Sequence, residues 1–275
     1  MNLYCLQSAL CGNLKAMKTR PGLPANYHTH TTRCRHASGT DREYVERAVS
    51  EGFAVLGFSD HTPWPYGPDD FTARRRMDLS QLPEYLISIR SLKEEFKDRI
   101  DIKVGLEAEY FPQYMSWLKD TIEEQKLDYV LLGNHYWGHS ESFEYYGYDC
   151  TPAAMRHYVD DLPKALETGL FMYVAHPDLM FSEYPCFDDN CISATRDIIA
   201  IAKEAGVPLE YNISGTWKRF RGLGYPTALF WEKAAECSMD VYLGFDAHEP
   251  FRISRKLFDD TASKLRAMGL NVLNA

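Results

Sequence analysis

Short apolar runs alternate with longer amphipathic segments along almost the whole chain, and this alternation restricts the fold more than any other feature. The short runs are rich in β-branched and aromatic residues, and the longer segments repeat apolar residues with the spacing of a helix. Such alternation is typical of repeated βα units and argues against a β-sandwich. The expected strands cover 25–27, 53–58, 102–107, 129–133, 171–175, 208–211 and 241–245, with 271–273 as an eighth candidate.

Amphipathic helices are expected between these strands. Thr40 and Glu43 have the spacing of a capping box, in which the Thr side chain caps the Glu amide and the Glu side chain reaches back. Gly169, Gly206 and Gly269 stand where three helices should end. The expected helices cover 40–50, 80–97, 113–126, 152–168, 190–205, 226–237 and 254–267. Seven or eight βα units predict an α/β barrel of parallel strands.

The length and composition favour one large domain. The chain has 275 residues, of which 45% are hydrophobic, enough for a single core. We expect residues 23–275 to form this domain, because no Pro/Gly/Ser-rich linker interrupts them. Residues 1–22 precede the regular pattern and are expected to be an extension outside the fold, with Met17 as an alternative start.

Charge and cysteine content argue against several classes of partner. The 30 basic and 39 acidic residues give a net charge of -9, so the broad cationic surface typical of nucleic-acid or membrane binding is not expected. Seven cysteines without a CxxC pair indicate reduced thiols. No apolar run reaches the roughly 20 residues of a membrane span, and no signal peptide is evident. We therefore expect a cytoplasmic protein; the sequence does not indicate its oligomeric state.

Histidines and carboxylates repeatedly follow the expected strands. Because parallel strands of a barrel end at one face, these residues should meet there, and alternation turns both histidines of an HxH pair to one side. Imidazole and carboxylate together suit zinc, manganese or iron. Each histidine alone is compatible with an ordinary loop, but seven of the nine at strand ends predict a metal cluster. The residues concerned are His28, His30, His36, Asp60, His61, Glu107, Glu109, His135, His176, Asp246 and His248. His139 and His157 lie outside the pattern and are expected to be surface or packing residues.

These positions fall within seven short motifs: YHTHTTRCRH (27–36), GFSDHTP (57–63), GLEAEYFP (105–112), LLGNHYW (131–137), VAHPDL (174–179), LEYNISG (209–215) and FDAHEP (245–250). With them the chain resembles, over about residues 24–250, the polymerase and histidinol phosphatase (PHP) family of metal-dependent phosphoesterases, and within it the histidinol-phosphate phosphatases. The resemblance implies a distorted TIM-like (β/α)7 barrel with a trinuclear metal centre. It also implies a small phosphorylated substrate, L-histidinol phosphate, and a place in histidine biosynthesis.

The resemblance also implies which residues bind each of the three divalent ions. One ion would take His28, His30, Glu107 and Asp246; a second Glu107, His135 and His176; a third His36, His61 and His248. Glu107 would be the bridging carboxylate. A metal-bridging hydroxide would attack phosphorus while the metals neutralise the developing charge. Either Asp60 or a metal-bound water is expected to protonate the leaving group, and the alternative role of Asp60 is to orient a ligand imidazole.

Expectations for the substrate side of the site are less specific. Arg219 and Arg221 follow the LEYNISG motif, where the family resemblance implies a phosphate-binding cation, and Lys218 is an alternative to them. Glu109 is expected to point to the same side of the strand as Glu107. It should therefore either contact a substrate amine or orient a histidine. Four aromatic residues are candidates for stacking on an imidazole: Trp64, Tyr66, Tyr110 and Trp137.

Three alternatives remain open from the sequence. An amidohydrolase-type barrel also begins with HxH, but the additional histidines and the lack of a suitable strand-end lysine argue against it. Another PHP phosphoesterase would use the same ligands on a different phosphate ester, and an inactive metal-binding module would keep the barrel alone. Motifs for an aspartyl phosphatase, a serine hydrolase and a Walker A NTPase do not occur.

Overall fold

In the computed structural model, which describes residues 23–67, 75–136 and 145–275, all paired strands are parallel. One sheet has the order β1-β2-β3-β4 and the other the order β5-β6-β7. The strands are β1 (Ala25–Asn26), β2 (Val55–Phe58), β3 (Asp101–Ala108), β4 (Tyr129–Leu132), β5 (Leu209–Asn212), β6 (Asp240–Gly244) and β7 (Asn271–Val272). The proposed extension 1–22, His139 and Trp137 lie outside the described residues.

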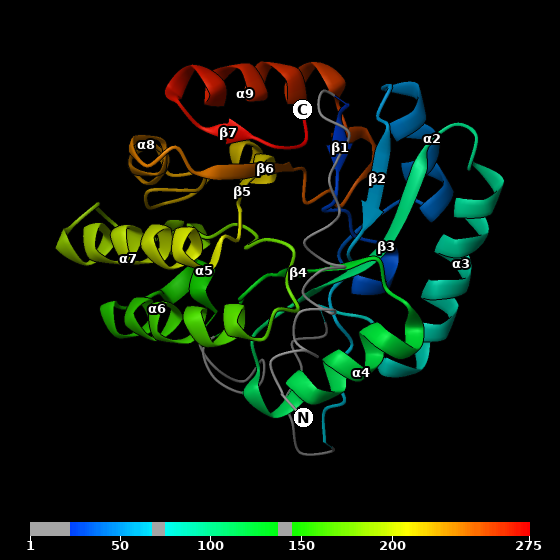
Figure 1. Cartoon of the computed structure of the whole chain (residues 1–275), viewed down its shortest axis with the longest axis horizontal. Helices are drawn as coiled ribbons and strands as arrows, with labels where there is room; N and C mark the ends of the chain where they lie inside the picture. Colours follow the sequence, from blue (N-terminus) through cyan, green and yellow to red (C-terminus); the bar gives the residue numbers. More distant parts are fainter. Residues whose placement is uncertain (1–22, 68–74, 137–144) are drawn as a thin grey trace, which may run out of the picture.

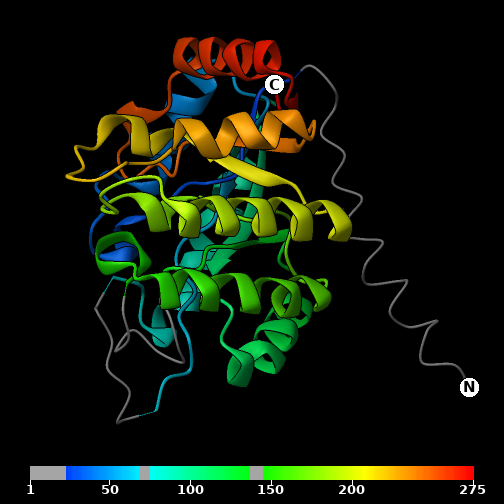
Figure 2. The same ribbon diagram turned by 90° about the vertical axis from the view of Figure 1, so that its left-hand side faces the viewer.

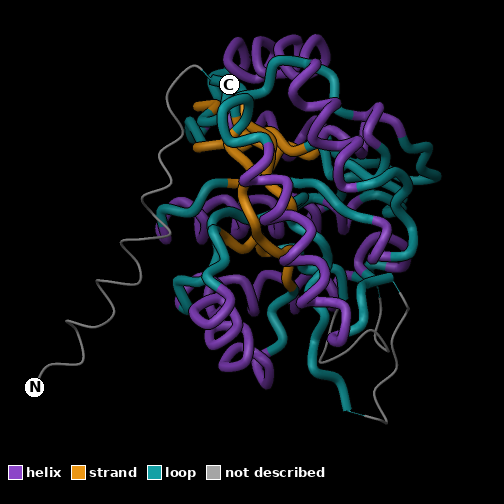
Figure 3. The backbone as a smooth tube through the Cα atoms, turned by 90° about the vertical axis from the view of Figure 1, so that its right-hand side faces the viewer, coloured by secondary structure: helices purple, strands orange, loops and turns teal. Residues whose placement is uncertain are grey.

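Two connections close the sheets into a barrel. On one side Val174 forms parallel bridges with both β4 and β5. On the other side Thr29 pairs with Ala247, and the Asn274 side chain donates to the carbonyls of both Ala25 and Leu243. The strands therefore lie inside a ring of helices, as Figures 1 and 3 show. This confirms the distorted parallel barrel expected from the sequence.

The segment 171–175, expected to be a strand, is the main departure from the predicted elements. Its Met172 amide donates to Val130 and its Ala175 amide donates to Leu132, so three steps along this segment match two steps along β4. The extra residue makes a bulge that interrupts the regular ladder, and only Val174 keeps a bridge on each side. The sequence pattern gives no sign of the bulge, because the run is apolar throughout.

All seven expected helices form, with ends shifted by a few residues. They are α2 (Asp41–Ser50), α3 (Leu82–Glu95), α4 (Met115–Gln125), α6 (Pro152–Glu167), α7 (Asp189–Ala205), α8 (Ala228–Glu236) and α9 (Arg255–Met268). The short α5 (Tyr146–Asp149) was not expected. Helices α6 to α9 lie one above another along one side of the barrel (Figure 2). Single 3-10 turns are η1 (Thr32–Cys34), η2 (Leu79–Gln81), η3 (Pro112–Tyr114), η4 (Leu179–Phe181), η5 (Ile213–Trp217) and η6 (Pro250–Arg252).

The helix ends follow the local sequence signals. Thr40 and Glu43 form the expected capping box at the start of α2. Gly206 and Gly269 adopt left-handed backbone conformations directly after α7 and α9, where a side chain would be strained. Within the described part of the chain, no helix has both the length and the apolar character needed to cross a membrane.

Candidate metal centre

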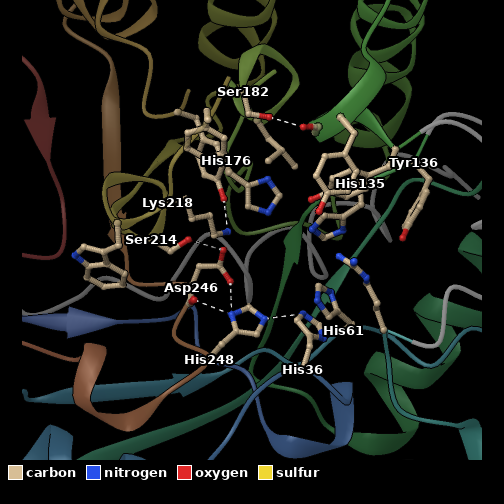
Figure 4. Close-up of a pocket in the computed structure, with 18 of the residues that line it drawn as sticks. His36, His61, His135, Tyr136, His176, Ser182, Ser214, Lys218, Asp246 and His248 are labelled. Carbon is tan, nitrogen blue, oxygen red and sulfur yellow. Dashed lines mark hydrogen bonds and ion pairs between the residues drawn. The ribbon is translucent and has the colours of Figure 1, made fainter. Parts of the chain in front are cut away.

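The residues expected to bind metal come together at the barrel end where the strands finish. His28 and His30 follow β1, and Glu107 lies within β3. The others come from the loops after β1, β2, β4, Val174 and β6: His36, His61, His135, His176, Asp246 and His248. Figure 4 shows five of these histidines and Asp246 turned toward one another around a cavity. Residues separated by up to 220 positions in the sequence thus form one cluster.

The Glu107 carboxylate lies in the middle of this cluster. It is 1% exposed and has an imidazole nitrogen of five different histidines within 3.6 Å. The distances are 2.8 Å from Oε1 to His176 Nε2, 3.4 Å to His28 Nε2 and 3.5 Å to His135 Nε2, and 2.9 Å from Oε2 to His61 Nδ1 and 3.6 Å to His30 Nε2. A carboxylate in this position can bridge two metal ions.

Asp246 forms a second acidic position beside Glu107. Its Oδ1 lies 3.0 Å from His30 Nε2 and 3.7 Å from His28 Nε2, while its Oδ2 accepts a hydrogen bond from Ser214 Oγ at 3.1 Å. Both His28 and His30 therefore lie between the two carboxylates, and each presents Nε2 to both.

His36 and His248 face each other in a way that favours a cation between or beside them. Their Nε2 atoms are 2.9 Å apart, and each Nδ1 lies against a backbone carbonyl, that of Cys34 for His36 and that of Asp246 for His248. Carbonyl oxygens only accept, so each Nδ1 carries the proton in a neutral ring. Burial lowers the pKa of both imidazoles, which favours those neutral rings. Two lone pairs then point at each other, an arrangement that a bound metal ion would relieve.

The donor set fits divalent metal ions. Several groups of three residues each place one ligand atom within 4.8 Å of the others: His36, His61 and His248; His28, His30 and Asp246; His28, Glu107 and His176; His30, His61 and Glu107; and His30, Cys34 and His248. Among the described residues, buried atoms without a hydrogen-bond partner include His28 Nε2, His30 Nε2 and Glu107 Oε2, all inside the cluster. Orphaned buried polar atoms are costly, and metal coordination would satisfy them.

The electrostatics of the cluster also favour bound cations. Burial alone would raise the pKa of Glu107, but His135, His28 and His61 hold it well below the usual carboxylate range. Although burial opposes a charged imidazole, Asp246 and Asp60 raise the pKa of His30 to about 9. Metal binding requires the deprotonated ligands, and a metal ion would supply the positive charge that the carboxylates otherwise draw from protons.

Three buried carboxylates orient the ligand histidines from behind. Glu210 lies 2.8 Å from His28 Nδ1, Asp60 lies 3.4 Å from His30 Nδ1, and Glu109 lies 3.1 Å from His135 Nδ1. A carboxylate at the outer nitrogen fixes the tautomer and the ring orientation, so that the inner nitrogen faces the metal. The described part of the chain therefore contains the carboxylate–histidine arrangement of metalloenzymes three times.

Of the two roles expected for Asp60, this geometry corresponds to the orienting one. The side chain is fully buried and is absent from the cavity wall. Its oxygens face His30 Nδ1, the His61 amide, and both the amide and the hydroxyl of Thr31. These contacts favour the orientation of His30 over proton donation to a leaving group.

Glu109 has a similar position, although it borders the cavity. Its oxygens accept from Trp64 Nε1 at 2.8 Å and form an ion pair with the buried Arg76 at 2.8 Å, besides contacting His135. Burial opposes ionisation, but Arg76 holds the pKa of Glu109 well below its usual range. The carboxylate is thus occupied by protein groups, which favours orientation of His135 over the expected contact with a substrate amine.

Two of the ligands have an unusual backbone conformation. His176 has φ of 30° and Asp246 has φ of 46°, in the left-handed region that is unfavourable for residues with a Cβ. Such conformations persist only where the surrounding structure imposes them, and they concentrate at functional sites.

A cavity of about 420 Å³ opens beside the cluster and is bordered by His36, His61, His135, His176, Asp246 and His248. Of the three cations considered for phosphate binding, only Lys218 borders it, where Nζ lies 2.7 Å from the Tyr225 hydroxyl (Figure 4). Arg219 and Arg221 are exposed and do not border the cavity. The cavity thus brings Lys218, itself an exposed residue, and neither of these two arginines to the candidate centre.

The aromatic wall of the cavity is also different from the expected one. Trp64 is buried behind Glu109, and neither Tyr66 nor Tyr110 borders the cavity. The cavity is instead bordered by Tyr136, Tyr145, Tyr148, Tyr225, Trp217 and Phe220. Positions in loops have no periodicity that could have identified these side chains.

Glu210 is the functional candidate that the sequence analysis missed. It lies in β5, where Leu209 and Tyr211 are apolar or aromatic and buried. A charged residue inside such a run, on the same strand face as Asn212, is the signal that could have identified it.

Comparisons with known proteins find relatives over most of the chain. The model of the PHP domain family matches residues 26–214. The probable histidinol-phosphatase of Deinococcus radiodurans is 32% identical over 247 residues, which cover 88% of this chain and 92% of that protein. The histidinol-phosphatase of Bacillus subtilis is 25% identical over 248 residues, which cover 81% and 92% of the two chains.

A solved structure has the same fold. The histidinol phosphate phosphatase of Lactococcus lactis, crystallised with zinc, L-histidinol and phosphate, superposes with a TM-score of 0.68 at 22% sequence identity. The match covers 91% of this chain and 95% of that one.

Proposed function

Since the chain belongs to the PHP domain family, we propose that it is a metal-dependent phosphomonoesterase that hydrolyses L-histidinol phosphate to L-histidinol and phosphate. The observation that carries the proposal is the convergence of imidazoles and two carboxylates, with orphaned ligand atoms, at the edge of a cavity that also holds a lysine. The relatives named as histidinol-phosphatases, and the L-histidinol and phosphate in the Lactococcus lactis structure, support the choice of substrate. The reaction would belong to histidine biosynthesis in the cytoplasm.

The proposed centre has three metal positions. His28, His30, Glu107 and Asp246 would hold one ion, and Glu107, His135 and His176 a second. The third would take His36, His61 and His248, which form one of the compact ligand groups. Divalent ions bound there would polarise the phosphoryl oxygens and lower the pKa of a water molecule that serves as nucleophile. Zinc, manganese and iron all suit such imidazole and carboxylate ligands.

The residues of the cavity wall then bind and orient the substrate. Lys218 brings a positive charge that is not paired with a carboxylate among the described contacts, whereas Arg76 is paired with Glu109 and Arg252 with Glu249. Arg75, which also borders the cavity, is hydrogen-bonded to Tyr148. We assign Lys218 to a phosphate oxygen because it borders the cavity directly after the LEYNISG motif. The rings of Tyr145 and Tyr148, 4.8 Å apart, offer an aromatic surface for the imidazole of the substrate.

The proposal is tested by steady-state hydrolysis with metal-replete protein. L-histidinol phosphate is compared with AMP, glucose 6-phosphate and phenyl phosphate, and bound metal is determined on the same sample. We expect the highest kcat/KM for L-histidinol phosphate and about three divalent ions per chain, the number proposed above. His28→Ala is the matched variant, and it should lose both metal and activity.

The other outcomes separate the parts of the proposal. A full metal complement with preference for another phosphate ester would keep the phosphatase and overturn the substrate. Bound metal without hydrolysis of any phosphate would overturn the enzymatic assignment.

Lys218→Gln is expected to lower kcat/KM for L-histidinol phosphate by about 10- to 100-fold, mainly through KM, since a hydrogen bond to a charged group contributes about 1.5–3 kcal/mol. Arg219→Gln, one residue further along the chain, is the control and should stay within about twofold, as expected for a surface position. The measurement is steady-state kinetics at saturating metal. A larger loss in Arg219→Gln than in Lys218→Gln would contradict the assignment.

A further inference from the structure

Glu210 contacts several parts of the candidate metal centre, although the proposed reaction gives it no role. Its side chain is fully buried in β5 and does not border the cavity, so it cannot contact the substrate. Oε1 lies 2.8 Å from His28 Nδ1 and 3.1 Å from the Tyr173 hydroxyl. Oε2 accepts from the His176 amide at 3.1 Å and from Asn212 Nδ2 at 2.9 Å.

Three of these four contacts lead to proposed metal ligands, and each of these ligands follows a different strand or strand-like segment. The contact with His28 fixes a ring that follows β1. The contact with the His176 amide fixes a residue with strained backbone, which follows Val174. Asn212 passes the connection to Asp246 after β6, because its Nδ2 also lies 3.4 Å from Asp246 Oδ2. One carboxylate thereby connects proposed ligands from both sheets, and from the segment at Val174 that joins the sheets.

The chemistry of the contacts requires a carboxylate. The His176 amide and Asn212 Nδ2 are donors, and Tyr173 and His28 Nδ1 also donate when His28 presents the lone pair of Nε2 to a metal. Only a group with two accepting oxygens satisfies all four donors. Glutamine would turn an NH₂ group toward at least one of them.

The backbone opposite leaves space for this side chain. A Cβ at Gly244 in β6 would overlap the Glu210 carboxylate, so the neighbouring strand can pass at this level only as glycine. Gly244 in β6 thus leaves the space that the Glu210 carboxylate of β5 occupies.

We propose that Glu210 is a positioning residue that sets the geometry of His28, His176 and Asp246 together, and thereby determines how tightly the centre binds metal. The inference rests on the metal-binding part of the proposed function and not on the identity of the substrate. Its test therefore uses metal and protein without any phosphate ester, so that a wrong substrate would leave the result unaffected.

The experiment measures Co²⁺ affinity by competition with a chromophoric chelator, and the visible absorption spectrum of the bound Co²⁺. Glu210→Gln is expected to weaken binding about 10- to 100-fold, the usual loss when a partner of a ligand histidine is removed, and to alter the spectrum. Gly244→Ala displaces the Glu210 carboxylate without changing its charge. This variant should also weaken Co²⁺ binding and alter the spectrum. Tyr211→Phe is the control, because Tyr211 lies on the other face of the same strand, against Trp231.

A purely structural role predicts a different result. Thermal unfolding of the metal-free variants would then show a lowered Tm, while the folded protein would bind Co²⁺ with wild-type affinity and spectrum. That outcome in Glu210→Gln would overturn the proposal. If Glu210→Gln does not fold without metal, wild-type affinity and spectrum in Gly244→Ala would overturn it equally.

Discussion

Glu107→Gln is expected to lower kcat/KM by more than about 100-fold, beyond the usual range for losing a residue that only orients a ligand. The carboxylate lies within 3.6 Å of five imidazoles, and an amide would keep the shape while removing the charge. It would also turn an NH₂ group toward nitrogen atoms that should present lone pairs to metal. The side chain packs directly against Gly133, where a Cβ would overlap it.

The comparison variant is Glu109→Gln, two residues further along the same strand. Among the described residues, Glu109 contacts one proposed ligand, His135, so its substitution should cost about 10- to 100-fold. Bound metal per chain, measured beside kcat/KM, should fall further in Glu107→Gln than in Glu109→Gln. Equal losses in the two variants would show that Glu107 does not bridge.

Removal of metal is expected to have the largest effect on stability. Ions that bind only the folded protein stabilise it by about 4 kcal/mol when their concentration is a thousand times Kd. For a chain of this size each kcal/mol corresponds to about 2–4 °C, so Tm should fall by about 10 °C after dialysis against a chelator. The physical reason is the orphaned ligand atoms and the mutually close carboxylates, which lose their common counter-charge.

Calorimetry with added metals makes this result specific. Zn²⁺ or Mn²⁺ should restore Tm, whereas Ca²⁺ at the same concentration should not, because Ca²⁺ prefers oxygen ligands and the cluster is mostly imidazole. His28→Ala should lose most of the rise with Zn²⁺. A chelated protein with an unchanged Tm, or an equal rise with Ca²⁺, would contradict the metal centre.

The sequence predicted the barrel and the cluster because both depend on regular elements. Strand periodicity and parallel topology place every residue that follows a strand at the same end, so His28 and Asp246 could be joined without knowing any distance. The bulge at 171–175 could not be predicted, since it depends on pairing with β4 rather than on local composition.

The substrate side was predicted less well, for a related reason. Lys218, Arg219 and Arg221 are chemically similar and adjacent in the sequence, and only the turn after η5 decides which of them faces the cavity. Asp60 was expected at the right place with two alternative roles, and only its burial and contacts favour one of them. Glu210 required knowledge of three other strands.

The contacts of Asn274 have a consequence for the order of events during synthesis. Its side chain donates to the carbonyl of Ala25, 249 residues away in the sequence, and also to that of Leu243, and Thr29 pairs with Ala247. Contacts of such high contact order form late, because a very long loop must close first. A nascent chain therefore exposes its HxH pair on the ribosome long before Asp246 and His248 have been made. The contacts of Asn274 that close the barrel can form only after residue 274 has left the ribosome.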